Sequence, residues 1–281
     1  MITRFAPSPT GHLHLGHLYA AKVAFDLAQK GDGQFLVRFE DIDHTRVRPE
    51  YYQSILDDLT WLGLTWDGIP WRQLDRLDAY QKALETLKAQ DLVYPCTCTR
   101  REIEAELKNL AHAPHGPEGP LYPGTCRGKT NPSNIEPAWR LDIEKALNFL
   151  QQKSKHPLTF QDDHFGKITA DPHQLGDVIL ARKDIGTSYH LAVVVDDAAQ
   201  NITHVTRGED LLTSTHIHRL LQALLDLPVP QYHHHPLVLD ENGERLAKRH
   251  NALSLKSLHE SGLTRAEIFK MAEQNLSSAG S

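Results

Sequence analysis

Residues 7–17 of the sequence, PSPTGHLHLGH, constrain the fold more than any other stretch. The two prolines and Gly11 predict a turn that leads into a helix carrying His14 and His17. Residues three apart share one helix face, and a helix start offers free N–H groups and a positive dipole end that suit a triphosphate. Gly16 lacks a side chain, so a flat ligand could lie against the backbone there. The stretch therefore predicts a nucleotide site at the start of a helix.

The segments around this helix predict a βαβ unit. Residues 3–6 have the pattern of a short buried strand, residues 14–30 that of a helix, and residues 34–39 alternate like a second strand. Parallel strands joined by a helix bind ligands beyond their carboxyl ends. We therefore expect residues 4–8 and 40–43 to lie at the same rim of an α/β fold.

A second informative stretch is RLAKR, residues 245–249. It follows a short apolar segment and the turn signal Asn242-Gly243, which predicts a loop. Lys248 could reach a phosphate from this loop, because a lysine is a compact charge on a flexible stem. Each stretch alone has a plainer explanation, since a histidine pair is often incidental and a basic cluster is usually a solvated surface.

Taken together, the two stretches resemble the His-Ile-Gly-His and Lys-Met-Ser-Lys-Ser motifs of class I aminoacyl-tRNA synthetases. The opening RFAPSPTG, residues 4–11, resembles the glutamate-specific branch of that class. The resemblance implies a Rossmann-like catalytic core in which the carboxylate of an amino acid attacks the α-phosphate of ATP, bound with Mg²⁺, and expels pyrophosphate. Such catalysis needs in-line positioning and positive charge near the phosphates.

The resemblance assigns roles to both motifs. His14, Gly16, His17 and Lys248 would bind ATP, and both histidines and Lys248 would be the catalytic residues. The loop departs from the family pattern at Arg245 and Ala247, where Lys and Ser are usual. The first change keeps a positive charge and the second removes a hydroxyl, while the lysine most needed is present.

A glutamate site is also implied by the resemblance. The positions that match it are Arg4, Phe5, Ala6, Pro7, Ser8, Glu40, Tyr189 and Arg207. Glu40 could hold the α-ammonium of the amino acid. Arg207 could pair bidentately with the side-chain carboxylate and so reject glutamine, because an amide cannot replace both acceptors. From the residue pattern alone, Arg207 could equally be the cation of a salt bridge at the end of a strand.

Val193 departs from ordinary glutamyl-tRNA synthetases, which usually have Asn at this position. The stretch YHLAVVVDD, residues 189–197, instead resembles the shorter glutamyl-queuosine tRNA(Asp) synthetases. These activate L-glutamate without tRNA and place it on the queuosine base in the anticodon loop of tRNA(Asp). Two alternatives stay open: a minimal glutamyl-tRNA synthetase that acts on a tRNA 3′ end, and a catalytically silent tRNA-binding paralogue.

All three cysteines, Cys96, Cys98 and Cys126, fall in one loop-rich segment. Three thiolates can hold Zn²⁺, which requires four ligands in a tetrahedron. A nearby histidine such as His112 or His115 is the better generic fourth ligand. The resemblance favours Tyr122, because the short family pairs Cys-x-Cys with Tyr-x-x-x-Cys. We expect one structural zinc ion per chain, the alternative being three reduced and idle thiols.

The composition is that of an ordinary globular enzyme, with 281 residues, 40% hydrophobic and 23% charged. No apolar run is long enough to span a bilayer, and there is no signal segment, so we expect a cytoplasmic monomer without a membrane partner. A net charge of −6 means that any contact with RNA must come from local basic surface. Arg100-Arg101 and residues 245–250 are candidates for that surface.

The chain divides into four predicted regions. They are residues 1–93 and 136–240, the two halves of the nucleotide-binding core; 94–135, a zinc-binding insertion; and 241–281, the motif loop with a helical end. Further helices are expected at 49–62, 75–90, 214–225 and within 252–276, and further strands at 138–142, 177–181, 190–195 and 203–207. The residues after Arg249 are too few for a separate domain of about 100 residues, so we expect no anticodon-binding domain.

Overall fold

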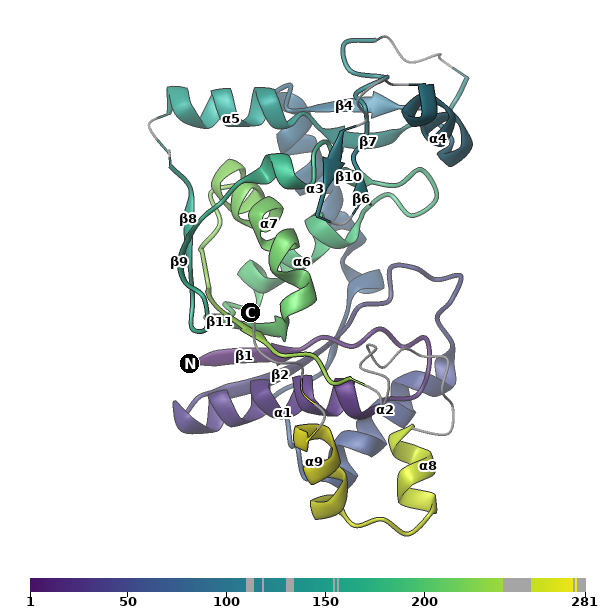
Figure 1. The fold of residues 1–281 in the computed structure, drawn as a ribbon, viewed down its shortest axis with the longest axis vertical. Coiled ribbons are helices and arrows are strands. Elements are labelled where there is room, and N and C mark those ends of the chain that lie inside the picture. The colour runs from purple at the N-terminus through teal and green to yellow at the C-terminus, as the bar shows by residue number, and fades with distance from the viewer. Residues whose placement is uncertain are drawn as a thin grey trace.

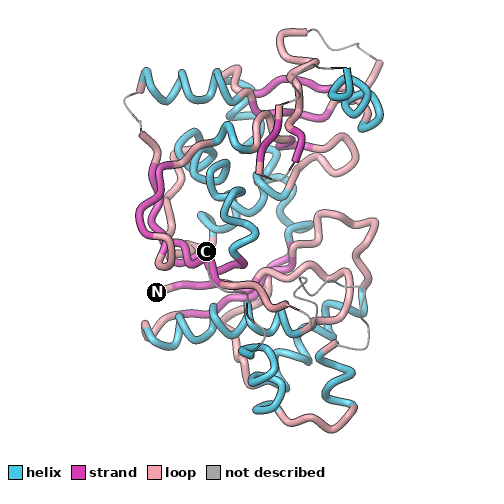
Figure 2. The backbone as a smooth tube through the Cα atoms, viewed as in Figure 1, coloured by secondary structure: helices cyan, strands magenta, loops and turns pink. Residues whose placement is uncertain are grey.

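The structure is a computed structural model that describes residues 1–109, 114–117, 119–129, 134–153, 155, 157–239, 254–274 and 276. Parallel strands lie near the middle of an elongated α/β molecule, with an antiparallel sheet at one end and the C-terminal helices at the other (Figure 1). Helices lie on both sides of the central strands (Figure 2). The predicted α/β class is therefore confirmed.

The N-terminal βαβ unit forms as predicted. Strand β1 (Ile2–Phe5) pairs in parallel with β2 (Gln34–Phe39), and α1 (Leu15–Lys30) connects them. His14 caps α1 by accepting the backbone N–H of Gly16. The helix buries one stripe made largely of alanines, which lets its backbone lie close to the sheet.

A second group of strands lies on the other side of β1. Strand β11 (His204–Gly208) lies beside β1, where the N–H of Thr203 donates to the carbonyl of Ile2 over 3.0 Å. Strand β12 (Gln231–His235) pairs in parallel with β11, and the short β3 (Trp71–Arg72) pairs with β2 at the opposite edge. The strand order therefore reverses around β1, which is where a doubly wound sheet opens a crevice for ligands.

The shared rim predicted for the ends of β1 and β2 is confirmed, because the N–H of Glu40 donates to the carbonyl of Pro7 over 3.0 Å. Three predicted helices also form close to their expected bounds. They are α2 (Pro49–Leu62), α3 (Leu77–Ala89), which follows a 3₁₀ turn at Gln73–Arg76, and α7 (Leu212–Leu224).

The strand predicted at residues 190–195 is wrong, because these residues lie in helix α6 (Tyr189–Ala199). A short continuous apolar run does not distinguish a buried strand from a buried helix. Leu191, Ala192, Val193 and Val194 are all buried, so α6 is covered on most sides and shows no polar stripe over that stretch. Ser188 precedes the helix in an extended conformation.

A hairpin of β8 (Thr159–Asp162) and β9 (Gly166–Thr169) extends the parallel sheet beside β12 and was not predicted. Its turn is built by Asp162, whose carboxylate accepts the N–H groups of His164 and Phe165. An Asp that begins a turn, followed by a Gly at positive φ, is a recognisable turn pattern.

The segment with the cysteines belongs to a separate antiparallel sheet. Its strands are β4 (Val93–Cys96), β7 (Ala138–Leu141) and β10 (Ile179–Ala181), in the order β10-β7-β4. The other elements here are α4 (Arg100–Asn109), β5 (His115–Gly116), β6 (Gly119–Pro120) and α5 (Ile143–Gln152). The predicted strands at 138–142 and 177–181 are confirmed, and 203–207 corresponds to β11.

Two short helices, α8 (Leu255–Glu260) and α9 (Arg265–Gln274), form the predicted helical C-terminal region. They pack against α1 and α2, where the ring of His259 stacks on Trp61 at 4.0 Å between ring centres. Within the described ranges, every helix is too short or too polar to cross a lipid bilayer.

Candidate active site

A cavity of about 430 Å³ opens at the carboxyl ends of β1, β2 and β11. It brings together all eight residues that the sequence assigned to glutamate. Its lining is Arg4, Phe5, Ala6, Pro7, Ser8, His17, Ala20, Glu40, Tyr189, Thr206, Arg207, Gly208 and Leu211. Residues from three distant parts of the chain therefore meet at the crevice that the strand order creates.

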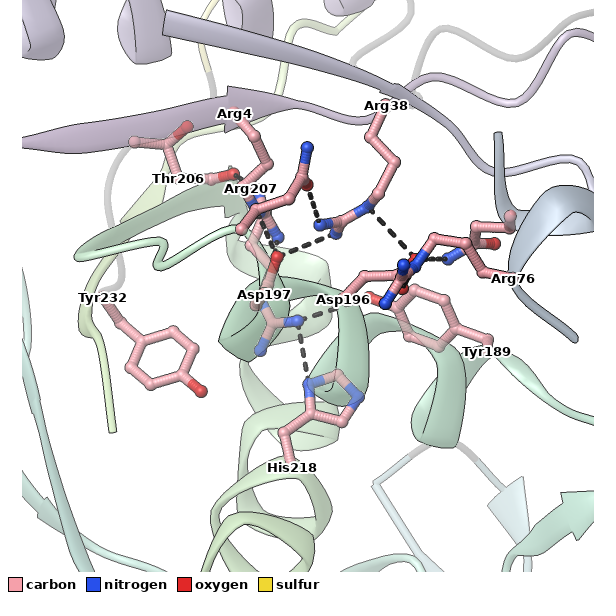
Figure 3. Close-up of polar contacts among 12 residues, drawn as sticks. Arg4, Arg38, Arg76, Tyr189, Asp196, Asp197, Thr206, Arg207, His218 and Tyr232 are labelled. Carbon is pink, nitrogen blue, oxygen red and sulfur yellow. Dashed lines mark hydrogen bonds and ion pairs between the residues drawn. The ribbon is translucent and has the colours of Figure 1, made fainter. Parts of the chain in front are cut away.

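Behind this cavity, Arg4 and Arg38 share one buried carboxylate (Figure 3). Asp197 accepts from the Nε of Arg4 at 2.9 Å and from the Nη2 of Arg38 at 2.8 Å. The Nη1 of Arg4 also donates to the carbonyl of Thr206 at 3.0 Å. Burial opposes the ionisation of Asp197, but the two guanidinium groups outweigh it and lower its pKa below the ordinary value.

The neighbouring Asp196 is fully buried and faces the other way, toward α3 and the turn before it. Its carboxylate accepts from the Nε of Arg76 at 2.6 Å and from the hydroxyl of Tyr80 at 2.7 Å. Its Oδ2 also lies 3.9 Å from the Nε of Arg38. The two successive aspartates of α6 therefore share Arg38 of β2, while Asp197 adds Arg4 of β1 and Asp196 adds the start of α3.

Glu40 lies in the cavity close to the charges of Arg4 and Arg38. Burial raises the pKa of its carboxyl to about 7, although both arginines act to lower it. A carboxylate whose ionised form is poorly solvated has a strong preference for a cationic partner. An amino acid's α-ammonium would be such a partner.

Arg207 is buried on the opposite strand of the cavity, with 6% of its surface exposed. Its Nη1 donates to the hydroxyl of Tyr189 at 3.3 Å and to the Nδ1 of His218 at 3.0 Å (Figure 3). Its Nε donates to the Nε2 of His234 at 3.2 Å, and Nη2 donates to the hydroxyl of Thr215. The strand-end salt bridge that the pattern alone allowed does not form, because these partners are uncharged acceptors.

The two histidines of the N-terminal motif take different positions. His14 is the N-cap of α1, and its backbone N–H donates to the Nδ1 of His17 at 3.2 Å. His17 lines the cavity, whereas the ring of His14 lies over Gly16, where an added Cβ would be 3.1 Å from His14 Cε1. The space predicted for a flat ligand at Gly16 is therefore filled by an imidazole in this structure.

The second motif is the basic stretch at residues 245–249. Arg245, Ala247 and Lys248 lie outside the described residues. The role predicted for Lys248 stays a prediction from the sequence.

The three cysteines converge as the sequence predicted. The thiol sulfurs of Cys96, Cys98 and Cys126 lie within 4.8 Å of one another. The hydroxyl oxygen of Tyr122 lies 3.4 Å from Cys96 Sγ and 3.6 Å from Cys98 Sγ. Tetrahedral zinc places its sulfur and oxygen ligands roughly 3.5–3.8 Å apart, so these four atoms fit one zinc ion.

Two groups contact Tyr122 from outside the thiol cluster, although burial and the neighbouring thiols raise the pKa of its hydroxyl well above the ordinary value. The backbone N–H of Cys126 donates to it at 2.9 Å, and the guanidinium of Arg140 lies 3.7 Å above the ring. Burial opposes ionisation of Cys126, but hydrogen bonds from Tyr122 and Cys98 lower the pKa of that thiol to about 7. His115 is exposed and outside the cluster, and His112 is not among the described residues. Tyr122 is therefore better placed than His115 as a fourth ligand.

Several residues of the site escaped the sequence prediction. These are Arg38, Asp197, Thr215, His218 and His234, which hold Arg4 and Arg207 from behind. His234 belongs to an HHH tract at residues 233–235 that the sequence analysis assigned to no element. Its place in a strand could have been recognised from the turn before it, and alternation would then have put His234 on one face and its neighbours on the other.

A family model described as tRNA synthetases class I (E and Q), catalytic domain, matches residues 1–275. A glutamyl-Q tRNA(Asp) synthetase of Rhodobacter capsulatus is 50% identical, covering 96% of this chain and 99% of that protein. One from Nitratidesulfovibrio vulgaris is 42% identical, covering 94% and 83%. A glutamate–tRNA ligase of Oleidesulfovibrio alaskensis is 40% identical over 94% of this chain but only 54% of its own length.

Among solved structures, a glutamate tRNA ligase of Elizabethkingia meningosepticum in complex with its amino acid matches with a TM-score of 0.68 and 29% identity. The match covers 94% of this chain and 53% of the ligase, so this chain spans about half the length of that enzyme. A methionyl-tRNA synthetase of Mycobacterium tuberculosis, 11% identical with a TM-score of 0.59, shares the fold alone. With its cavity, its motifs and these relatives, the chain belongs to the class I tRNA synthetases (E and Q), in the family of glutamyl-Q tRNA(Asp) synthetases, and is an ATP-dependent ligase.

Proposed function

We propose that this chain activates L-glutamate with ATP in the absence of tRNA and transfers it to the queuosine base in the anticodon loop of tRNA(Asp). The observation that carries the amino-acid part is a single cavity lined by an anion, Glu40, and a buried cation, Arg207. Glu40 would bind the α-ammonium, and Arg207 would bind the side-chain carboxylate. Arg4 adds a second guanidinium at the same cavity.

In the activation step, an oxygen of the α-carboxylate attacks the α-phosphorus of ATP. The bond from that phosphorus to the bridging oxygen breaks, which yields glutamyl-adenylate and pyrophosphate. His17 at the start of α1, His14 and Lys248 would stabilise the charge that grows on the phosphates. Mg²⁺ bound with ATP would neutralise part of the same charge.

In the transfer step, a hydroxyl of the acceptor attacks the carbonyl carbon of the adenylate, and AMP leaves. Queuosine carries a cyclopentene diol that presents two neighbouring hydroxyls, as the ribose of a terminal adenosine does. The relatives that match over nearly their full length are named glutamyl-Q tRNA(Asp) synthetase, and this supports queuosine as the acceptor.

A second candidate is a minimal glutamyl-tRNA synthetase that acts on the 3′ end of a tRNA. The glutamate–tRNA ligase of O. alaskensis favours it, since its match is nearly as strong in identity as several of the glutamyl-Q matches. A glutamate cavity would look much the same in both enzymes, because both form the same adenylate.

We further propose that Cys96, Cys98, Tyr122 and Cys126 hold one zinc ion. The ion would fix the geometry of the segment between β4 and β7 and would not take part in the reaction. The match between the spacing of these four atoms and tetrahedral coordination supports this assignment.

The test of the function is a charging assay with radiolabelled glutamate and three RNAs: tRNA(Asp) with queuosine, tRNA(Asp) without it, and tRNA(Glu). We expect label only on the first, and nuclease mapping should find it on the anticodon fragment. Pyrophosphate exchange dependent on glutamate and ATP should proceed without RNA. Label on the 3′-terminal nucleotide, or equal charging of tRNA(Asp) lacking queuosine, would favour the minimal glutamyl-tRNA synthetase.

A further inference from the structure

We propose that His218 is a specificity-determining positioning residue, which holds Arg207 through an uncharged acceptor so that its positive charge stays available for the substrate. This inference rests on the proposed binding of glutamate in the cavity and extends it to a layer of residues outside the cavity lining.

The partners of Arg207 are all neutral, and this sets it apart from the other buried arginines of the site. Arg4 and Arg38 both donate to the carboxylate of Asp197. Arg207 instead donates to His218, His234, Thr215 and Tyr189. Its guanidinium carbon lies 5.4 Å from the ring centre of Tyr232, and Figure 3 shows it beside His218. Within the part of the chain that the structure describes, its charge is thus solvated by hydrogen-bond acceptors but is not paired with a carboxylate.

On one side of Arg207, the hydrogen bond between His234 and Asp162 decides which ring nitrogen of His234 carries the hydrogen. The Nδ1 of His234 lies 2.6 Å from the carboxylate of Asp162, which accepts, so this nitrogen carries the hydrogen. The Nε2 of His234 is then free to accept from Arg207 Nε at 3.2 Å. The hydroxyl of Thr215 lies 2.9 Å from the same Nε2.

On the other side, Arg207 can only donate, so the Nδ1 of His218 accepts and its hydrogen is on Nε2. That Nε2–H donates to the Nδ1 of His190, 3.2 Å away. His190 lines a neighbouring cavity that shares Ser8, Glu40 and Tyr189 with the glutamate cavity. The direction of the chain of hydrogen bonds is thus set by Arg207.

These rings are neutral near pH 7. Burial, and next the charge of Arg207, lower the pKa of His218 well below its ordinary value and that of His190 to about 4. Burial also lowers the pKa of His234 to about 4, although its hydrogen bond to Asp162 opposes this. His218 and His234 are therefore neutral acceptors that position the guanidinium and leave its charge unchanged, and His190 accepts from His218.

A carboxylate in place of His218 would make the same hydrogen bond and would cancel the charge. The substrate carboxylate would then gain little from Arg207, and glutamate would lose its advantage over glutamine. Selection of an acid over an amide therefore depends on a neutral residue at position 218 as well as on the arginine itself.

The variants H218N and H218D test this, because they have the same shape and differ in charge. The side-chain oxygen of either residue can reach the position of the histidine Nδ1. In glutamate-dependent pyrophosphate exchange, we expect H218N to raise KM for glutamate a few-fold. H218D should raise it about 10- to 100-fold, the range expected when a hydrogen bond to a charged group is lost. The preference for glutamate over glutamine should fall in parallel, with kcat changing less than KM.

His216, on the same helix, supplies the control. Its Nδ1 accepts the N–H of Asp171 and its ring packs on Phe160, so it contacts neither Arg207 nor the cavity lining. H216D puts the same new charge on α7, and we expect KM and the preference for glutamate to stay at wild-type values. Thermal unfolding of every variant separates a loss of binding from a loss of fold.

The outcomes separate this inference from the proposed function. If the wild-type protein exchanges pyrophosphate with glutamate but H218N and H218D share one KM, the role of His218 is overturned while the function stands. If the wild-type protein shows no exchange with glutamate, the proposed function fails and the inference fails with it. Should H218D not fold, H218N is compared with H218L, which lacks an acceptor. The inference then requires H218N to retain the lower KM, and equal values would overturn it.

Discussion

At the scale of single residues, the site shows two ways of burying an arginine. The charges of Arg4 and Arg38 are compensated by Asp197, which makes them part of the framework. Among the described residues, the hydrogen-bond partners of Arg207 are all uncharged. A buried cation without a counter-ion is costly to the free protein, and that cost would be recovered when an anion binds. The residue with the least compensated charge is therefore the one that we expect to select the substrate.

We expect Glu40 to make the activity dependent on pH. Burial raises its pKa to about 7, so the carboxyl becomes neutral as the pH falls through 7 and can no longer pair with the α-ammonium of glutamate. We expect kcat/KM for glutamate in pyrophosphate exchange to fall about tenfold per pH unit below 7, since this ratio reports the free enzyme. The value of kcat should hold to lower pH, because the bound ammonium favours the ionised form.

The variant E40Q is the control for this pH dependence. Its kcat/KM should be low at every pH and should lack the acid limb near 7. A wild-type profile that stays flat from pH 8 to 5.5 would show that Glu40 does not bind the ammonium in its ionised form.

Lys248 should act on the transition state rather than on glutamate. The charge that it meets grows as pyrophosphate leaves, so K248A should lower kcat of exchange by about 100-fold or more, with KM for glutamate nearly unchanged. Lys256 serves for comparison, because it is an exposed residue of α8 that pairs with Glu260, and K256A should leave both constants as they are. A rise in KM with constant kcat would assign the loop another role.

At the scale of elements, the segment between β4 and β7 depends on more than its own packing. Its buried cluster consists of Tyr94, Cys96 and Cys126, with Cys98 and Tyr122 partly buried against them. Helix α4 has no buried residue. So small a core supplies little folding free energy, and metal coordination would have to supply the rest.

We therefore expect about one zinc per chain in protein purified without chelators. Removal of the metal, or C126S, should speed backbone hydrogen exchange from Cys96 to Arg127 and leave exchange in β1 and β2 unchanged. Y122F should keep the metal but release it to a chelator faster than the wild-type protein. Purified protein that contains no zinc would exclude the site.

The helices that sequence analysis predicted correctly have residues at their ends that mark where a helix starts or stops. Helix α1 has a capping histidine and a glycine at its end, and α2 has Pro49 in its first turn. The element that it got wrong, α6, is apolar on most sides over residues 191–194 and owes its helical state to the tertiary core around it. Local pattern cannot show how many sides of a segment the rest of the chain will cover.

For the site, the residues that line the cavity could be predicted from the sequence, and the residues behind Arg207 could not. Residues at the ends of β1 and β2, and Arg207, follow from motif and strand position. His218 and His234 do not follow from motif or strand position, because each contacts Arg207 of β11 from another element. His218 lies on α7 and His234 on β12. Such contacts depend on which elements pack together, and the packing of elements is known only from the tertiary structure.

At the scale of the whole molecule, the two halves of the sheet are joined through α6. Strands β1 and β2 come from the first 39 residues, while α6 and β11 come from residues 189–208. Thr203, the residue before β11, holds one end of this junction: its N–H donates to the carbonyl of Ile2, and its hydroxyl accepts the N–H of Ile2. Asp197 holds the other, since its one carboxylate accepts from Arg4 of β1 and Arg38 of β2.

Loss of Asp197 should therefore destabilise the whole chain and not only the site. D197A removes the counter-ion of Arg4 and leaves Arg38 only its longer contact with Asp196, 3.9 Å from Nε. Removal of one partner from a buried ion pair costs about 3–5 kcal/mol. We expect a loss of that size in the free energy of unfolding measured in urea. D163A is the control, since Asp163 is exposed and its carboxylate pairs with His233 and Gln231 at the surface, where about 0–1 kcal/mol is expected.

The pH dependence of this stability gives an independent check. Arg4 and Arg38 hold the pKa of Asp197 below its ordinary value against the effect of burial. The contribution to stability is therefore fully present above the unfolded pKa of about 4 and is lost as the pH falls through the lower folded pKa. The wild-type protein should lose its advantage over D197A on acidification through that window. If D197A and D163A unfold at the same urea concentration at pH 7, the halves of the sheet are held together without Asp197.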